Sequence, residues 1–379
     1  MTDASMPTVL CLSSQVFNSD IEVLMEFGKR FQWAIINDQF LINAQRDWIP
    51  TRAQTQALYA NESGPDIDEG WRKAKEYGLR FLRDMQARCN LVAVLAGNWD
   101  YWQDEGLRLA CRELDIPFLV LHRELQISEF DRTVRDGFYA DCSLKPNITA
   151  VAMGGQCNID LFLDCKVFTK DNMRLTGWPR YDRWELMPTK PLYDRPIVLM
   201  AYMQGYYSGN HFAEMLQVFS ATAERYPHIP FVVKAKHSGE YPQIRAELDK
   251  MGSRCELTDT IVMPALIKNA RAVIGFNSMA VYEALLTEAR ILVPQWGDAA
   301  ADPRYQAPSP RDVAMLPHMH FMDSLDDFQR LIDTIASAWL PPVDRAARIN
   351  AFSSVVHYST RQTATRRVED FIAEFARKT

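Results

Sequence analysis

Residues 91–121 read LVAVLAGNWDYWQDEGLRLACRELDIPFLVL, and the order of their apolar and polar residues indicates the class of fold. The run Leu91–Ala96 predicts a buried strand, and 103–114 predicts a helix because apolar residues recur on one face. Pro117 precedes a second apolar run, Phe118–Leu121. A strand, a helix and a strand with short connections form a βαβ unit, whose two strands lie parallel. The sequence therefore predicts an α/β fold built on a parallel sheet.

The same alternation extends in both directions from this stretch. Toward the N-terminus it predicts strands at Thr8–Leu12 and Trp33–Ile36 and a helix over 68–88. Toward the C-terminus it predicts strands at Ile197–Tyr202, Phe231–Lys236, Ala272–Phe276 and Ile291–Pro294. Helices are predicted at 211–226, from Pro242 onward, at Met279–Thr287, near 326–339 and near 363–377.

Residues 185–195 contain two prolines and show no hydrophobic period, so they are predicted to link two domains. Two domains suit a chain of 379 residues, since domains commonly run to roughly 100–200 residues. We expect an N-terminal domain over 1–185, a C-terminal domain over 186–350 and a closing segment over 351–379. Two parallel α/β domains of similar size are expected to face a central cleft, where ligands usually bind.

The composition excludes several classes of protein. The chain has 42 basic and 48 acidic side chains, a formal net charge of −6 and no block of like charge, so nucleic acid is not expected as a partner. Its seven cysteines are scattered without a C-x-x-C pair, which argues against a zinc site. His318 and His320 lack further ligands at suitable spacing, so no metal is expected.

Membrane insertion and secretion are also not expected. No apolar run approaches the roughly 18 residues of a membrane-spanning helix. The N-terminus has no positively charged leader, and its first apolar run is short. The sequence predicts a cytoplasmic protein with at most peripheral contact with the inner face of a membrane.

The segment 273–286, VIGFNSMAVYEALL, is the first that carries chemistry. An apolar strand is predicted to end at Gly275, and Asn277 or Ser278 is a natural N-cap for the helix that follows. The carboxyl end of a strand that leads into a helix is an anion site in open α/β sheets, and Glu283 could accept hydrogen bonds from ribose hydroxyls. The plainer alternative is an ordinary capped helix with an ordinary first-turn carboxylate.

The segment 231–240 places cations at the end of another predicted strand. Lys234 and Lys236 share one face of the strand, and His237 and a glycine loop follow. Such groups would neutralise the charge that grows on a pyrophosphate leaving group. A solvated loop with surface lysines is the alternative.

The segment 174–184 joins the predicted domains and is dense in arginines and aromatic residues. Gly177, Arg180 and Asp182 are candidates for a hinge or for the lining of the cleft. A junction capped by aromatic rings is the other interpretation, and it is the one that we favour.

Residues 97–104 and 121–124 each follow a predicted strand of the N-terminal domain. Asp100, Asp104 and Glu124 are candidates for the base that activates an acceptor hydroxyl, while Asp100 or Asp104 could instead cap a helix. Several aromatic residues could stack on a sugar or fill the core. They are Trp99, Tyr101, Trp102, Trp178 and Trp184.

Three of these segments resemble a known pattern. Thr-Gly-Trp-Pro-Arg-Tyr-Asp (176–182) resembles the Thr-Gly-x-Pro-Arg-x-Asp segment of bacterial surface-polysaccharide transferases and of polyol-phosphate transferases. The strand–helix turn at 273–285 resembles their donor site, and 232–237 resembles their Lys-x-His-Pro motif, with Ser238 in the place of the proline. The resemblance covers roughly residues 90–300.

The resemblance implies a GT-B fold: α/β, with two Rossmann-like, doubly wound domains. It implies a nucleotide-activated donor without a metal or other cofactor, and a C-terminal helix, here 363–377, that crosses back to the first domain. Donor-binding residues would be Lys234, Lys236, His237, Asn277, Ser278 and Glu283. His237 would be catalytic, while the resemblance leaves the catalytic residue of the N-terminal domain open. Asp100 first, and Glu124 second, are the candidates there, because of their position at strand ends and their chemistry.

The expected function is the transfer of a sugar from a UDP-, GDP- or CMP-sugar, with CMP-Kdo one candidate, to a glycan or glycolipid acceptor. The acceptor would be a bacterial surface polysaccharide or lipopolysaccharide, such as capsule or O-antigen. A CDP-polyol phosphotransferase, a sugar-nucleotide epimerase and a non-catalytic glycan-binding scaffold of the same fold are the alternatives.

Overall fold

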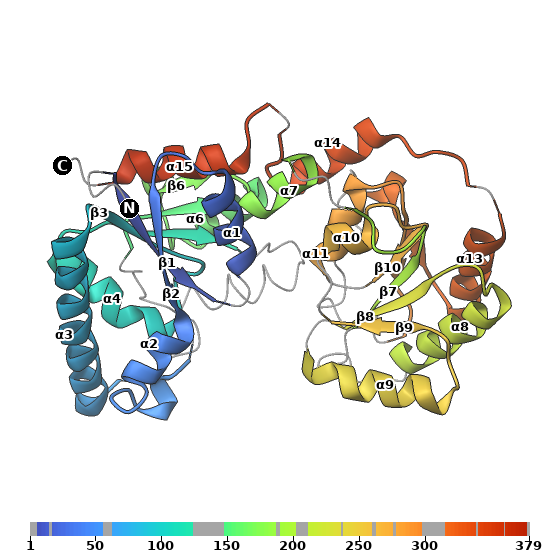
Figure 1. Ribbon diagram of the computed structural model, residues 1–379, viewed down its shortest axis with the longest axis horizontal. Coiled ribbons are helices and arrows are strands. Elements are labelled where there is room, and N and C mark those ends of the chain that lie inside the picture. Colours follow the sequence, from blue (N-terminus) through green and yellow to red (C-terminus); the bar gives the residue numbers. More distant parts are fainter. Residues whose placement is uncertain are drawn as a thin grey trace. The chain divides into compact units, whose positions relative to one another are not determined.

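The computed structural model divides the chain into two compact units. The residues that it describes are 6–14, 17–55, 63–123, 148–186, 190–201, 211–235, 238–259, 263–275, 278–297, 315–338, 340–359 and 361–376. Unit 1 comprises the described residues up to Glu185 together with those from Val356 onward, and unit 2 comprises those from Leu186 to Val355 (Figure 1).

Unit 1 is built on a parallel sheet that has six strands within the described residues, in the order β2-β1-β3-β4-β5-β6. The strands are β1 (Thr8–Ser13), β2 (Gln32–Asn37), β3 (Leu91–Ala96), β4 (Phe118–His122), β5 (Ala150–Met153) and β6 (Met173–Leu175). Every residue of β1, β3, β4 and β5 is buried, as expected for parallel strands that are covered on both faces.

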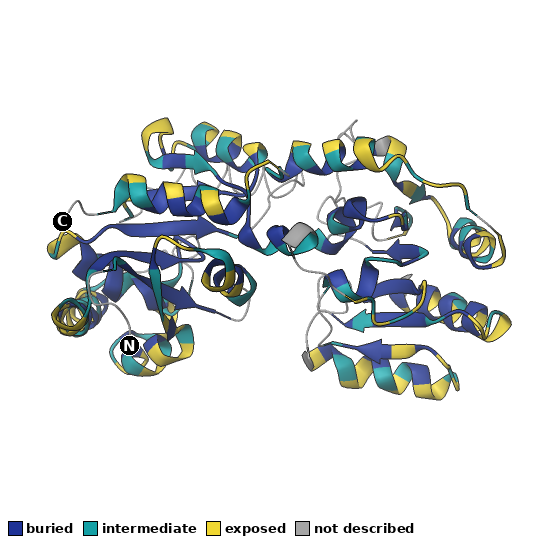
Figure 2. Ribbon diagram, turned by 45° about the horizontal axis from the view of Figure 1, so that its top comes forward, coloured by how far each residue is buried: buried dark blue, intermediate teal, exposed yellow. Residues whose placement is uncertain are grey.

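Helices flank this sheet and present one apolar face to it, as the colouring by burial in Figure 2 shows. They are α1 (Asn18–Phe27), α2 (Asp38–Gln45), α3 (Pro65–Arg88), α4 (Trp102–Glu113), α6 (Gln156–Asp164) and α15 (Ala364–Phe375). The 3-10 turn η4 (Pro179–Asp182) and the short helix α7 (Arg183–Leu186) lie at the boundary of the units.

Unit 2 repeats the architecture with a second parallel sheet, in the order β12-β11-β10-β7-β8-β9 over the part of the unit that is described. The strands are β7 (Ile197–Ala201), β8 (Phe231–Ala235), β9 (Glu256–Thr258), β10 (Ala272–Ile274), β11 (Arg290–Pro294) and β12 (His320–Met322). The chain begins in the middle at β7, builds outward to β9, and returns to the other side of β7 at β10. This is the strand order of the Rossmann fold, with its reversal between β7 and β10.

The helices of unit 2 pack on both faces of its sheet. They are α8 (His211–Arg225), α9 (Tyr241–Lys250), α10 (Met263–Ile267), α11 (Met279–Glu283), α13 (Leu325–Ser337) and α14 (Arg345–Val355), with the 3-10 turn η6 (Ala284–Leu286). Phe219, Phe231 and Phe328 belong to one continuous core of this unit. None of the described helices is long and apolar enough to cross a membrane.

The structure differs from the sequence predictions in several elements. Strands β5, β6, β9 and β12 and helices α1, α2, α6, α7, α10 and α14 were not predicted. The helix predicted over Met279–Thr287 is α-helical only to Glu283 and continues as a 3-10 turn. The closing segment predicted at 351–379 is divided between the units, because residues up to Val355 complete α14 in unit 2 and unit 1 resumes at Val356.

Candidate active site

The carboxyl edge of the unit 2 sheet is the first candidate site, because ligands of doubly wound sheets bind where the strand order reverses. Strands β7 and β10 flank the reversal and end at Ala201 and Ile274. Gly275 follows β10 directly. A Cβ atom at this position would lie 3.0 Å from Val281 Cγ2 and 3.2 Å from Met200 Cβ, so a side chain would crowd helix α11 and the end of β7.

Ser278 and Glu283 lie at the two ends of the short helix that follows. Ser278 is its N-cap, and its Oγ accepts a hydrogen bond from Ala280 N at 3.3 Å, so the predicted cap at Asn277 or Ser278 is confirmed for Ser278. Glu283 is the last residue of α11 and is half-buried. Both polar side chains therefore come from the turn that follows the reversal point.

Lys234, at the end of β8, is used by the protein's own backbone. Its Nζ donates to Ala235 O at 2.7 Å and to Asp259 O at 2.8 Å, which ties the end of β8 to the segment after β9. Burial lowers the pKa of Lys234, while the nearby carboxylates of Asp259 and Glu240 oppose that shift. Lys236, His237, Asn277 and Glu124, also predicted as site residues, lie outside the described residues.

The carboxyl edge of the unit 1 sheet is the second candidate site. After β3, residues 98–101 are held by Arg108 of α4, which donates to Trp99 O and, at 3.0 Å, to Tyr101 O, and pairs with Glu105 at 2.6 Å. Arg108 was not predicted as a site residue. Its signal was an arginine on the inward face of a predicted helix, one position from Leu107.

Asp100 and Asp104 are brought together in this corner, and both are buried. Burial raises the pKa of Asp104 to about 7. Arg108 opposes this rise, and Asp38, Asp100 and Glu105 add to it. A carboxyl group with such a pKa exchanges protons readily at neutral pH.

The N-cap position of α4 is occupied by Tyr101, and not by Asp100 or Asp104 as the alternative had it. The side chain of Tyr101 makes no capping hydrogen bond.

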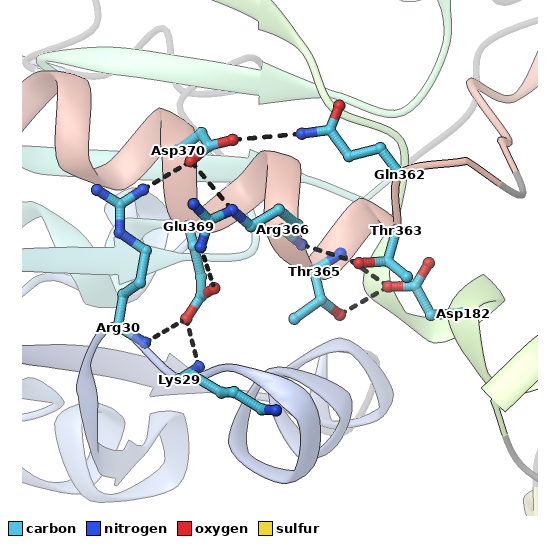
Figure 3. Close-up of polar contacts among 9 residues, drawn as sticks. All are labelled: Lys29, Arg30, Asp182, Gln362, Thr363, Thr365, Arg366, Glu369 and Asp370. Carbon is cyan, nitrogen blue, oxygen red and sulfur yellow. Dashed lines mark hydrogen bonds and ion pairs between the residues drawn. The ribbon is translucent and has the colours of Figure 1, made fainter.

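The segment 176–182 contacts several other parts of unit 1. The buried carboxylate of Asp182 accepts hydrogen bonds from Thr365 N and Thr365 Oγ1 (Figure 3) and from Ala364 N, at 2.6–2.8 Å. These bonds fix the start of α15. Gly177 has φ +71°, and a Cβ atom there would lie 2.1 Å from His357 O. These two candidates for a hinge or cleft residue therefore hold the C-terminal segment in place.

Arg180 forms a buried ion pair that the sequence analysis also missed. Its backbone N–H and Nη1 donate to the carboxylate of Asp20 at 2.9 and 3.2 Å, and its Nη2 donates to Arg123 O at 3.0 Å. Burial raises the pKa of Asp20, and attraction to Arg180 opposes that rise. No sequence signal singles out Asp20, which lies 160 residues from its partner.

Two of the aromatic residues that could have lined a groove are core residues. Trp99 is 2% exposed and Trp178 is fully buried. Trp178 Nε1 donates to His122 O at 2.7 Å, and the Arg180 guanidinium lies 4.6 Å from the centre of its ring. Among the residues that the structure describes, no three His, Cys, Asp or Glu side chains gather in a group that could hold a metal ion.

Known proteins with similar structures support the fold. No protein-family model matches the sequence, and no curated protein matches it. A UDP-GlcNAc 2-epimerase from Methanocaldococcus jannaschii is similar with a TM-score of 0.56 and 11% identity, over 97% of this chain and 100% of that one. A UDP-GlcNAc 2-epimerase from Neisseria meningitidis, bound to UDP-GlcNAc, is similar with a TM-score of 0.54 and 11% identity, over 97% of this chain and 100% of that one.

MnaA of S. aureus, in a co-structure with UDP, is similar with a TM-score of 0.54 and 12% identity, over 97% of this chain and 96% of that one. At such low identity these similarities show the fold alone. The predicted fold class is confirmed: the chain has an α/β, GT-B-like fold with two Rossmann-like units, each built on a six-stranded parallel sheet in its described residues.

Proposed function

We propose that the protein is an enzyme that acts on a nucleotide-activated sugar, with UDP as the nucleotide, bound at the carboxyl edge of the unit 2 sheet. The observation that carries the proposal is the position of Gly275, Ser278 and Glu283 at the reversal between β7 and β10, where doubly wound sheets bind their ligands. Two proteins of the same fold, similar over nearly the whole chain, have structures with UDP or UDP-GlcNAc bound.

Each proposed residue has a chemical role in this site. The backbone at Gly275 lets the diphosphate approach, the Ser278 hydroxyl donates to it, and the Glu283 carboxylate accepts from ribose hydroxyls. We further propose that the phosphates are faced by Lys236, His237 and Asn277, which lie in the sequence at or just after the ends of strands of this sheet. Asp100 of unit 1 is the proposed base, with Glu124 second.

Sugar transfer to a surface glycan or glycolipid is the first reaction that we propose, on the resemblance carried by residues 176–182, 232–237 and 273–285. Epimerisation of the sugar is the second, because the similar structures named above include two UDP-GlcNAc 2-epimerases that align over their full lengths. A CDP-polyol and CMP-Kdo are the alternative substrates, and they are tested together with the UDP-sugar.

Nucleotide binding tests the proposal first. UDP should raise the melting temperature more than CDP, CMP or GDP, because a ligand that binds more tightly stabilises the folded state more at the same concentration. At 100 times its Kd, a ligand stabilises the folded state by about 2.7 kcal/mol. Glu283→Gln should abolish most of the shift. Glu214→Gln, an exposed carboxylate on α8 of the same unit, should keep it. Equal responses of both variants, or no response to any nucleotide at millimolar concentration, would contradict the proposed site.

The need for an acceptor then distinguishes sugar transfer from epimerisation. UDP-GlcNAc is incubated with the protein alone and followed by NMR. A new UDP-sugar isomer without acceptor would establish epimerisation, whereas release of UDP only with an added glycan acceptor would establish transfer.

A further inference from the structure

Strand β2 is the one long strand at an edge of either sheet within the described residues. The strand orders place β2, β6, β9 and β12 at the four edges. Strands β6, β9 and β12 have three residues each, whereas β2 has six. The backbone groups on the open side of an edge strand can pair with another chain, and proteins commonly keep such strands short or interrupt them.

The sequence of β2 has none of the features that usually prevent pairing. It reads Gln-Trp-Ala-Ile-Ile-Asn, without a proline or a charged residue, and its register with β1 is regular. Ile35 is 48% exposed, and Phe40, in α2 directly after the strand, is 50% exposed. A long, regular and partly apolar edge strand is a template for association with another strand.

The backbone groups of alternate residues of β2 face away from β1. Gln32 N donates to Pro7 O at 2.8 Å, so the N–H and C=O groups of Gln32, and of Ala34 two residues later, face β1. Successive residues of a strand direct these groups to opposite sides, so those of Trp33 and Ile35 face the open side. Neither Trp33 nor Ile35 forms a backbone hydrogen bond with another element in the part of the chain that the structure describes.

The charged residues at the two ends of β2 have opposite signs. Lys29 and Arg30 precede the strand, and Asp38 follows it. Arg30 pairs with Asp370 at an exposed position, and Asp38 has no ion pair with any described residue. A second β2 that ran antiparallel would bring the cationic end of each strand beside the acidic end of the other, whereas a parallel one would bring like charges together.

We propose that two copies of the chain associate through β2, with the two strands antiparallel about a two-fold axis at Ala34. In this register Trp33 of each copy lies opposite the partner's Ile35 and exchanges both backbone hydrogen bonds with it, because both residues face the open side. The same patch serves both copies, so the association closes as a dimer and joins the two unit 1 sheets into one.

The charges select this register among those that the backbone allows. At the two-fold axis proposed, Arg30 of each copy lies opposite the partner's Asp38. A shift by two residues in either direction would keep the hydrogen bonds but would place Arg30 opposite the partner's Ile36 or the partner's Phe40. Opposite charges that face each other across two strands stabilise the pair.

The oligomeric state of the full chain tests the proposal first. Sedimentation equilibrium at micromolar concentration should give twice the mass of one chain. Ile35→Lys should give a monomer, because lysine on an edge strand opposes pairing. Leu192→Lys is the matched control, since Leu192 is 55% exposed but belongs to unit 2, and it should leave the dimer intact. A monomeric wild type, or a dimer that survives Ile35→Lys, would overturn the proposal.

A disulfide across the axis tests the register without weakening the interface. Opposite residues that exchange no hydrogen bonds have Cα atoms about 4.5 Å apart, a distance that a disulfide spans. Ala34→Cys should therefore give a covalent dimer on oxidation, well above the background of the wild type. Asn37→Cys on the same strand should not, because the two copies of residue 37 would lie about 20 Å apart. Equal cross-linking of the two variants, or none at position 34, would contradict the proposed pairing.

Reversal of charge tests the contact between Arg30 and Asp38. Arg30→Glu and Asp38→Lys should each raise the Kd of the dimer roughly tenfold, because like charges then face each other twice in the two-fold interface. The two changes together should restore most of the affinity. Arg30→Glu with Asp370→Lys is the control, since it reverses the pair within one copy and should stay weak. A double variant with Asp38→Lys that binds no more tightly than the single variants would refute the register.

Discussion

At position 177, the absence of a Cβ atom explains why the sequence pattern has a glycine. Gly177 combines a φ of +71° with a position where a Cβ atom would lie 2.1 Å from His357 O. The glycine of the Thr-Gly-x-Pro-Arg-x-Asp pattern therefore allows the C-terminal segment to lie against the end of β6. The requirement comes from the close approach of two backbones, which no local propensity reveals.

Gly177→Ala should destabilise the protein by about 2–4 kcal/mol, because it adds overpacking to the cost of a left-handed backbone. Gly252→Ala is the matched control, since Gly252 has φ +60° but open space around it. That control should lose only about 1 kcal/mol. Both variants are compared by urea denaturation, and equal losses would show that the contact with His357 contributes nothing.

At the scale of the element, α15 is held to unit 1 by carboxylates that accept backbone N–H groups. The buried Glu369 accepts from Lys29 N at 2.6 Å and Arg30 N at 2.7 Å, in the connection between α1 and β2. Asp182, in η4, accepts in the same way from backbone N–H groups in the first turn of α15 (Figure 3). One carboxylate thus comes from α15 and the other from the part of unit 1 on which α15 packs. Such charge-assisted bonds are stronger than those between neutral groups.

Substitution of two neighbouring acidic residues of α15, Glu369 and Asp370, should therefore lower the stability of the protein by very different amounts. Glu369→Ala leaves two backbone donors unpaired and should cost about 2–4 kcal/mol. Asp370→Ala removes an exposed ion pair with Arg30 and should cost no more than about 1 kcal/mol. Hydrogen exchange of residues 364–375 should quicken in the first variant alone. Similar exchange in both would mean that apolar packing holds α15 by itself.

Elements with a long hydrophobic period were predictable from the sequence, and short ones were not. Helices α3, α4, α8, α13 and α15 lie within a few residues of their predicted positions, because each repeats its apolar face over three or more turns. Strands β5 and β6 have four and three residues, too few for a period. Their place in the sheet depends on pairing with β4 and with each other, which is tertiary information.

The site residues divide in the same way. Ser278, Glu283, Asp100 and Asp104 follow predicted strands, so their position at a carboxyl edge could be inferred from the alternation of elements. Asp20 and Arg108 were missed because their partners are far away in sequence or are backbone atoms. The sequence marks which edge of a sheet carries polar groups, but the pairing of buried charges needs the three-dimensional structure.

At the scale of the whole molecule, unit 1 is built from two separate parts of the chain. Unit 1 is completed by residues from Val356 onward, after the whole of unit 2. Val368, Phe371 and Ile372 of α15 are buried in unit 1. At about 1.5–3 kcal/mol for each buried apolar side chain, these three contribute roughly 5–9 kcal/mol, as much as the entire stability of many domains.

Truncation after Val355 should therefore unfold unit 1 and leave unit 2 folded. Hydrogen exchange distinguishes the two: amides of β1 and β3 should exchange at unprotected rates, while those of β7 and β8 in the same molecule serve as the internal control. A peptide of residues 356–379, added in excess, should restore protection of β1 and β3. A peptide with the Glu369→Ala change should restore it only at higher concentration, because it lacks the acceptor for Lys29 and Arg30. Full protection of β3 in the truncated chain would show that the N-terminal half forms a complete domain without its C-terminal helix.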